Sequence, residues 1–162
     1  MTPEEVLAAV SGSKLALELA PRDIADLATI MEGRLLEDGE VLMREGEVDD
    51  RLYCITSGRL AVEKSSPSTQ EAITLHILST GDLAGELAIV DGNEHTATLR
   101  AIGPTQVVSL ARDALEGLLD THPQVVYYVM RAIVRSGHSI VRRMNLQYVE
   151  LSNYLTGDPG EA

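Results

Sequence analysis

A series of short apolar segments between glycines occupies residues 35–110, and it limits the fold more than any other feature of the chain. Regularly spaced short strands with turn residues between them indicate a β-sandwich or a β-barrel. We predict strands at residues 52–55, 60–62, 73–78, 96–102 and 106–110. The glycines of the series are Gly39, Gly46, Gly58, Gly81, Gly92 and Gly103, and Pro104 follows the last of them.

Helical patterns flank the predicted strands on both sides. Residues 3–10 and 21–31 have helical apolar spacing, residues 112–120 predict a short helix, and a long helix follows from Pro123. Proline suits the first turn of a helix, where its missing N–H costs nothing. We therefore expect one mainly β domain: N-terminal helices in residues 1–33, a β-roll in 34–111 and C-terminal helices in 112–155.

Length and composition exclude several classes of protein. The 162 residues suit one domain with a real core. No apolar run approaches about 18 residues, so we expect no membrane span, and Met1–Glu5 lacks the basic start of a secretory signal. Cys54 is the only cysteine, which excludes an internal disulfide and fits a reducing cytoplasm. A net charge of −12 opposes non-specific binding to nucleic acid.

The charge is unevenly distributed along the chain. Residues 1–50 hold thirteen acidic and four basic side chains, whereas residues 123–155 hold four arginines and one glutamate. The simpler interpretation is two solvated faces of opposite sign. The alternative is an acidic end that meets a basic helix within a dimer.

The segment at residues 81–100 contains the best candidate for a ligand site. Gly85 lets the backbone pass close to a ligand, and residues 86–90 can form one helical turn whose free N–H groups would hold an anion. Glu86 is an acceptor within reach of hydroxyl groups. A hydroxyl-bearing anion, such as a sugar phosphate, suits this arrangement.

This segment resembles the phosphate-binding cassette of cyclic-nucleotide-binding domains. Residues 85–89, Gly-Glu-Leu-Ala-Ile, match the first half of the family pattern, and residues 96–99, Thr-Ala-Thr-Leu, match its end. The resemblance extends over about residues 20–145. It implies a double-stranded β-helix, or jelly-roll-like β-roll, with cAMP or cGMP as the ligand and with no cofactor. The residues that it assigns to the ligand are Gly85, Glu86, Leu87, Ala88, His95, Thr96 and Ala97.

Two positions of the cassette depart from the family pattern. Glu94 stands where the family has proline, and His95 stands where it has the arginine that grips the cyclic phosphate. A neutral histidine offers one donor, whereas arginine offers a charged fork. Losing a charge-assisted contact costs about 1.5–3 kcal/mol, or about tenfold to over a hundredfold in affinity. Arg51 and Arg100 are the nearest cations in sequence that could compensate.

The resemblance also assigns roles to Glu86 and Thr96. Glu86 corresponds to the acceptor of the ribose 2′-hydroxyl, and Thr96 to the hydroxyl residue that touches the phosphate. The alternatives are a carboxylate that caps its own short helix and an ordinary strand threonine.

The long C-terminal helix carries an apolar stripe with nearly the spacing of a coiled coil. In the resembling bacterial regulators this helix pairs two subunits, so we expect a homodimer. The alternative is that the stripe packs on the chain's own β-roll. The predicted stripe contains Val126, Met130, Ile133, Gly137, Ile140, Met144 and Leu151, with Tyr148 near its gap.

No catalytic set is present in the sequence, so we expect no enzyme. His76, His95, His122 and His138 form no close pair at metal-ligand spacing. Residues 152–162 are too short and too acidic for a helix-turn-helix, so we expect no DNA binding by this chain.

The leading prediction is a cytoplasmic regulatory module that binds a cyclic nucleotide or a related phosphate ligand and acts on an unidentified protein effector. The main alternative is a degenerate module with an empty pocket, kept as a dimerisation or docking scaffold, and a haem or gas sensor is the third.

Overall fold

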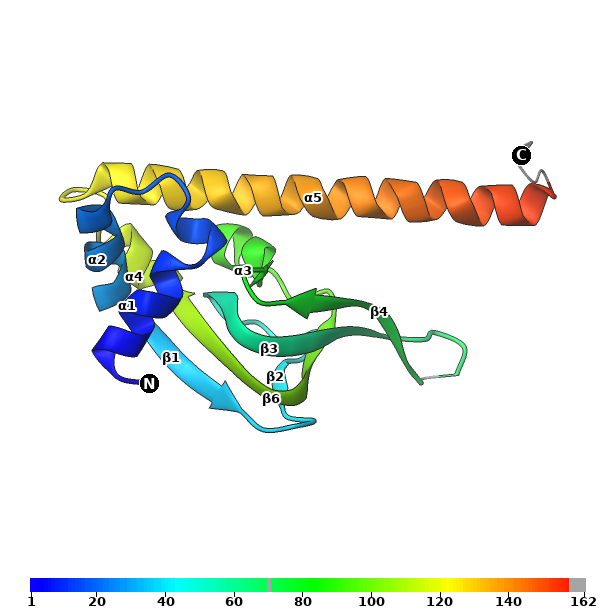
Figure 1. Cartoon of the computed structure of the whole chain (residues 1–162). Coiled ribbons are helices and arrows are strands. Elements are labelled where there is room, and N and C mark those ends of the chain that lie inside the picture. The colour runs from blue at the N-terminus through cyan, green and yellow to red at the C-terminus, as the bar shows by residue number, and fades with distance from the viewer. Residues whose placement is uncertain (70, 158–162) are drawn as a thin grey trace.

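The computed structural model describes residues 1–69 and 71–157, in which six antiparallel strands form a rolled sheet with helices along one side (Figure 1). Four strands follow the order β1-β6-β3-β4, while β2 pairs with β6 and β5 pairs with β3. This is the predicted mainly β fold with flanking helices. The strands are β1 (Met31–Leu36), β2 (Val41–Met43), β3 (Arg51–Ser65), β4 (Ala72–Ser79), β5 (Leu83–Ala84) and β6 (Thr98–Ala111).

The helices begin at residues that suit helix starts. Thr2 caps the first helix by accepting a hydrogen bond from the Glu5 N–H at 3.2 Å, and the Glu5 carboxylate accepts one from the Thr2 N–H at 2.7 Å. Pro3, Pro21 and Pro123 begin three of the helices. The helices are α1 (Pro3–Ser11), the 3-10 turn η1 (Lys14–Ala16), α2 (Pro21–Thr29), α3 (Glu86–Asp91), α4 (Arg112–Glu116) and α5 (Pro123–Thr156).

Several predicted element boundaries were wrong. The helix predicted to reach residue 31 ends at Thr29, because Met31 already pairs with Leu110 in the sheet. The helix predicted over 112–120 stops at Glu116. Gln70 and residues 158–162 lie outside the described residues, and so does part of the segment 152–162 that we expected not to form a DNA-binding domain.

The five predicted segments fall into three of the six strands, β3, β4 and β6. Segments 52–55 and 60–62 both belong to β3, and 106–110 belongs to β6 together with most of 96–102. Gly58 has a φ of +85°, and the register of β3 with β6 shifts between Ile55 and Ser57 and again between Ser57 and Arg59. A β-bulge of this kind lets a strand change direction while it stays hydrogen-bonded in the sheet. The sequence pattern shows two separate apolar segments and does not reveal that they form one strand.

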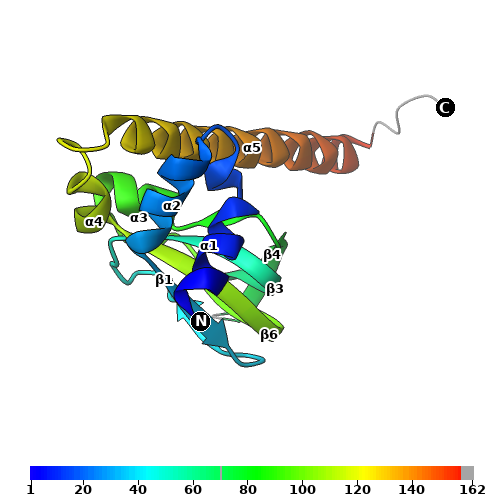
Figure 2. The ribbon, with the colours of Figure 1, turned by 60° about the vertical axis from the view of Figure 1, so that its left-hand side comes forward.

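Two hydrophobic clusters hold the molecule together. One fills the roll and includes Leu36, Ile55, Leu60, Leu99 and Val107. The other lies between the roll and the helices, where residues of α1, α2 and the start of α5 pack on β3 and β6 (Figure 2). Because the second cluster joins segments from both ends of the chain, the flanking helices and the roll form one domain.

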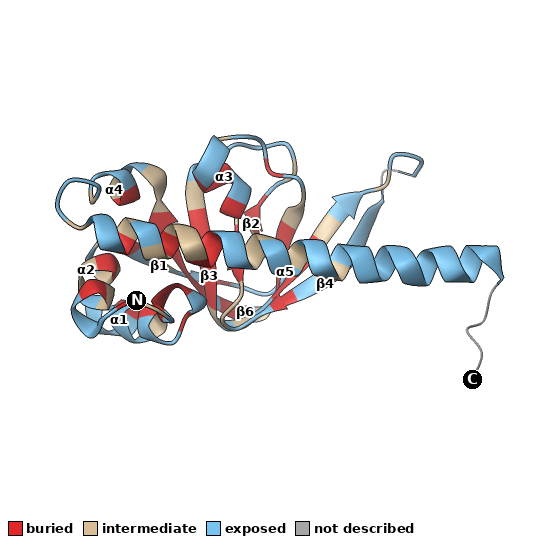
Figure 3. Cartoon of the chain, turned by 90° about the horizontal axis from the view of Figure 1, so that it is seen from above, coloured by how far each residue is buried: buried red, intermediate tan, exposed pale blue. Residues whose placement is uncertain are grey.

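Helix α5 continues well beyond the roll. Its buried residues are Val125, Val129, Ala132 and Ile133, all in its first third, and the helix is exposed from Met144 onward (Figure 3). Over the residues that the structure describes, no helix is both long enough and apolar enough to span a membrane.

Candidate functional site

The backbone at the start of the cassette helix requires glycine at position 85. Gly85 begins α3 with φ of +77°, a left-handed backbone conformation that residues with a side chain rarely adopt. A Cβ at this position would lie 2.5 Å from the Arg51 carbonyl oxygen. Glycine is therefore required here on two grounds, and the short helix predicted to follow it is present as α3.

A pocket of about 680 Å³ lies beside the cassette, between the roll and α5. Of the seven predicted ligand residues, Gly85, Glu86, Thr96 and Ala97 line it. Leu87 does not, and its side chain is 63% exposed, while Ala88 is buried elsewhere. Most of the wall is apolar, and its apolar residues are Met43, Val62, Leu75, Leu78, Leu83, Ala84, Ala97, Leu99, Ile140 and Met144.

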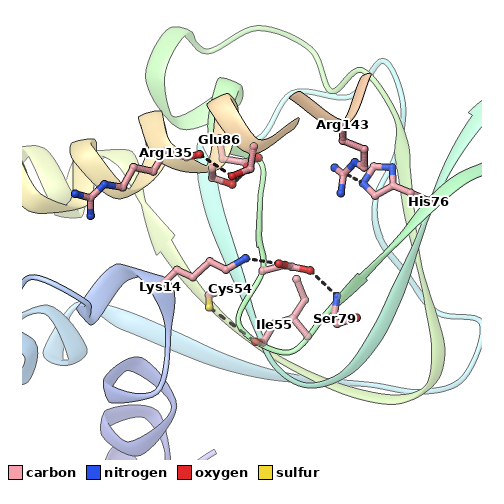
Figure 4. A network of polar contacts seen from close by, with 11 residues as sticks. Lys14, Cys54, Ile55, His76, Ser79, Glu86, Arg135 and Arg143 are labelled. Atoms are coloured by element: carbon pink, nitrogen blue, oxygen red, sulfur yellow. Dashed lines mark hydrogen bonds and ion pairs between the residues drawn. The ribbon is translucent and has the colours of Figure 1, made fainter. Parts of the chain in front are cut away.

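Glu86 is a buried carboxylate on the wall of this pocket. It is 9% exposed, and the Ser136 hydroxyl on α5 donates a hydrogen bond of 2.6 Å to its Oε1 (Figure 4). Burial raises the pKa of Glu86, and the hydrogen bond from Ser136 offsets part of that rise. The carboxylate therefore has a hydroxyl partner supplied by α5, in addition to its place at the start of α3.

His95 occupies a different place from the one predicted. Its side chain is buried, and its Nε2 lies 3.3 Å from Oδ2 of Asp49 without hydrogen-bond geometry. Its backbone N–H donates to the Glu47 carbonyl at 2.8 Å, and its carbonyl accepts from the Gly46 N–H at 2.9 Å. These backbone contacts hold residue 95 against the Gly46 turn, and His95 is not among the pocket residues. The structure thus does not bring His95 together with the predicted ligand residues that line the pocket.

The cations expected to compensate are also engaged elsewhere. Arg51 donates to Glu32 at 2.9 Å and to Ser109 at 3.0 Å. Arg100 donates to Glu63 at 3.2 Å and to the Gly39 carbonyl at 3.0 Å. Neither arginine lines the pocket.

Three basic side chains that the sequence analysis did not assign to the site do line the pocket: Lys64 of β3, His76 of β4 and Arg143 of α5. Lys64 pairs with Glu45 at 2.6 Å and donates to the Thr96 carbonyl at 2.8 Å. Arg143 contacts His76, with its Nη2 3.1 Å from Nε2 of the imidazole (Figure 4). Burial lowers the pKa of His76, and the guanidinium of Arg143 lowers it further. Arg143 lies seven residues after Ser136 and so shares its side of the helix, but only the structure shows that this side faces the pocket.

Comparison with known proteins places this fold and cassette in one family. The family model of the cyclic nucleotide-binding domain matches residues 34–122, which include most of the strands and the whole cassette. The chain belongs to the cyclic nucleotide-binding domain family.

Individual relatives agree with this assignment. A "CRP-like cAMP-activated global transcriptional regulator" of Mycobacterium tuberculosis is 30% identical over 131 residues, which are 81% of this chain and 56% of the relative. A crystal structure of a cyclic nucleotide-binding domain from Methylobacillus flagellatus has a TM-score of 0.76 at 26% identity and covers 98% of this chain and 85% of its own. The catabolite activator protein of Thermus thermophilus has a TM-score of 0.71 at 25% identity, covering 86% and 63%. This chain spans a little over half the length of its curated bacterial relative.

Proposed function

We propose that this chain is a non-catalytic regulatory module that binds a cyclic nucleotide, or a related phosphate ligand, in the pocket beside α3. The observation that carries the proposal is Glu86, a buried carboxylate on the pocket wall whose present partner is a single hydroxyl group. A ribose hydroxyl could replace Ser136 as its donor. The name of the Mycobacterium tuberculosis relative, which describes it as cAMP-activated, supports this choice of ligand.

The pocket offers a route from ligand binding to α5. Ile140, Arg143, Met144 and Gln147 of α5 line it, and Ser136 donates to Glu86. A ligand that takes the place of the Ser136 hydroxyl would change how α5 is held against the roll. Binding would then favour one placement of α5 over another, as a population shift requires.

We also propose that α5 pairs two copies of the chain. An outer stripe with alternating three- and four-residue spacing runs along α5, on the side of the helix opposite Val125, Val129 and Ala132. Most of its side chains are exposed, and the apolar area exceeds what one small roll covers. The outer stripe contains Tyr127, Met130, Val134, Gly137, Val141, Met144, Tyr148, Leu151 and Leu155.

The stripe predicted from the sequence was partly wrong. Met130, Gly137, Met144 and Leu151 belong to the outer stripe, and Tyr148, placed near the gap, is a regular member of it. Two of them lie at its border, because Met130 also packs against the chain's own core and Met144 also lines the pocket. Ile133 is instead buried against the chain's own helices and roll, and Ile140 lines the pocket. One face of α5 therefore packs on the chain's own core, while pairing of two chains through the outer stripe stays a prediction.

Isothermal titration of the full chain with cAMP and cGMP tests the ligand proposal. We expect the wild type to bind, and Glu86→Gln to bind about tenfold or more weakly, because a hydroxyl loses a charged acceptor. Glu94→Gln removes the same charge from an exposed cassette position and should bind at least as well as the wild type. Absence of binding by the wild type would refute the proposal.

One observation favours a second candidate function, a scaffold that binds no cyclic nucleotide. The residue at the family's arginine position, His95, is buried beside Asp49 rather than in the pocket. A wild type that fails to bind either nucleotide but still dimerises through α5 would support this alternative.

A further inference from the structure

Arg143 is distinguished from the other basic groups around the pocket by its partner. Lys64 pairs with Glu45, and Arg131 and Arg135 both pair with Glu18. Within residues 1–69 and 71–157, no carboxylate lies within 4.0 Å of the Arg143 guanidinium. Its contact is His76, whose Nε2 can accept a hydrogen bond only while that nitrogen carries no proton. Arg143 is therefore a charge on the pocket wall without an anionic partner.

A buried or half-buried charge without a counter-ion is costly, which makes such a group a candidate for binding an oppositely charged ligand. Glu86 is the corresponding acidic group on another part of the wall, since its hydrogen-bond partner is the neutral hydroxyl of Ser136 rather than a cation. The acid and the base do not pair with each other, and apolar side chains such as Leu83 and Met144 line the same pocket. The wall therefore fits a ligand that carries a hydroxyl group and an anionic group on a largely apolar body.

We infer that Arg143 is the anion-binding residue of this pocket and that, on binding, its guanidinium moves from His76 to the ligand's anionic group. This inference rests on the proposed function, because it names the residue that replaces the family's cassette arginine. A guanidinium can hold a phosphate through two parallel hydrogen bonds, which His95 could not provide even if it faced the pocket.

The position of Arg143 on α5 has a mechanical consequence. Two polar contacts join α5 to the roll at the pocket: Ser136 to Glu86 and Arg143 to His76. A ligand bound by Glu86 and Arg143 would replace both contacts with contacts to itself. The anion-binding group would then belong to the moving helix rather than to the cassette, so the ligand's charge would act directly on the position of α5.

Titrations with cAMP and with uncharged adenosine separate a charge contact from general damage to the pocket. We expect Arg143→Gln to weaken cAMP binding about tenfold or more while leaving adenosine binding within about twofold. Arg143→Lys, which keeps the charge but not the fork, should lose less affinity for cAMP than Arg143→Gln. The matched control is Arg142→Gln, which removes an exposed arginine from the preceding position of the same helix. This variant should bind both compounds like the wild type.

Two results would overturn the inference: unchanged cAMP affinity in Arg143→Gln, or an equal loss for cAMP and adenosine. If the wild type binds no cyclic nucleotide, the proposed function fails and inorganic phosphate becomes the probe. Phosphate should then raise the melting temperature of the wild type and Arg142→Gln but not of Arg143→Gln. An equal phosphate response in all three proteins would overturn the inference in that case.

Discussion

Glu86 is a buried carboxylate that has a hydroxyl group rather than a cation as its partner. Burial penalises its charged form and raises its pKa, and the single hydrogen bond from Ser136 compensates only in part. Compared with the unfolded chain, folding therefore shifts Glu86 towards its protonated form. A ligand hydroxyl bound at Glu86 would add a second donor that favours the charged form.

The raised pKa of Glu86 predicts a pH dependence of stability. Its contribution is fully present below the pKa of the unfolded chain, about 4.5, and is lost as the pH rises through the higher folded value. Glu86→Gln cannot ionise and should lack this dependence. We expect the free energy of unfolding of the wild type to fall relative to that of the variant as the pH increases above about 4.5. Denaturant unfolding over a pH series measures this difference, and parallel profiles for the two proteins would contradict it.

At the scale of elements, α5 has two apolar faces with different partners. One face, at Val125, Val129 and Ala132, is buried against the chain's own core. The opposite face is the outer stripe, which continues past the end of the roll (Figure 1). Helices in proteins gain most of their stability from packing, so a partner on the outer stripe would stabilise this part of α5.

Substitution in the outer stripe should separate the two copies of the proposed dimer. A charge at Val141 would be buried without a partner in a helix pair, and Val141→Glu should weaken dimerisation by at least about tenfold, or about 1.4 kcal/mol. Leu146→Glu is the matched control, because Leu146 is also exposed on α5 but lies outside the stripe. Sedimentation over a range of concentrations distinguishes the two. A Val141→Glu protein that sediments like the wild type would place the interface elsewhere.

At the scale of the whole molecule, contacts between distant segments join the helices to the roll. Glu18 pairs with Arg131 at 3.2 Å, so an acidic residue of the first fifty meets the basic helix within one chain. Lys14 pairs with Asp82, which also accepts a hydrogen bond from the Ser79 N–H at 2.9 Å (Figure 4). These partly exposed ion pairs contribute little energy individually, so the shared hydrophobic cluster holds α5 and the N-terminal segment together. Contact between such charges across a dimer stays a prediction.

Ligand binding should be detectable along α5 by hydrogen exchange. Because Ile140, Arg143 and Gln147 line the pocket, saturating cAMP should slow amide exchange in residues 140–147. Strand β1, residues 31–36, contributes nothing to the pocket wall and should exchange at the same rate with and without cAMP. Mass spectrometry of peptic fragments measures both regions together. A change confined to the cassette would show that α5 does not respond.

The parts of the fold predicted correctly depend on local chemistry. Prolines begin α2 and α5, Gly85 has the left-handed φ that its turn needs, and α3 follows it as expected. The errors occurred where a decision depends on non-local pairing. Gly58 does not end β3, because β6 continues the ladder on either side of the bulge.

For the candidate site, too, the correct predictions depend on local sequence and the errors on non-local contacts. Gly85, Glu86, Thr96 and Ala97 were predicted correctly to lie together, since one short cassette carries all four. His95 belongs to the same cassette, yet its ring is buried because the backbone pairs with residues 46 and 47. Arg143 could be assigned only after the facing side of α5 was known.

By itself, the sequence determined the order of elements, the place of the cassette and the absence of an arginine at position 95, because these depend on residue identity and local backbone sterics. Only the tertiary structure decided which side chains meet across the pocket. Ser136 reaches Glu86 and Arg143 reaches His76 because the rotation of α5 is set by the burial of Val125, Val129 and Ala132 in the core. Packing between segments far apart in the chain set that rotation, and the rotation in turn decided which charged side chains line the pocket.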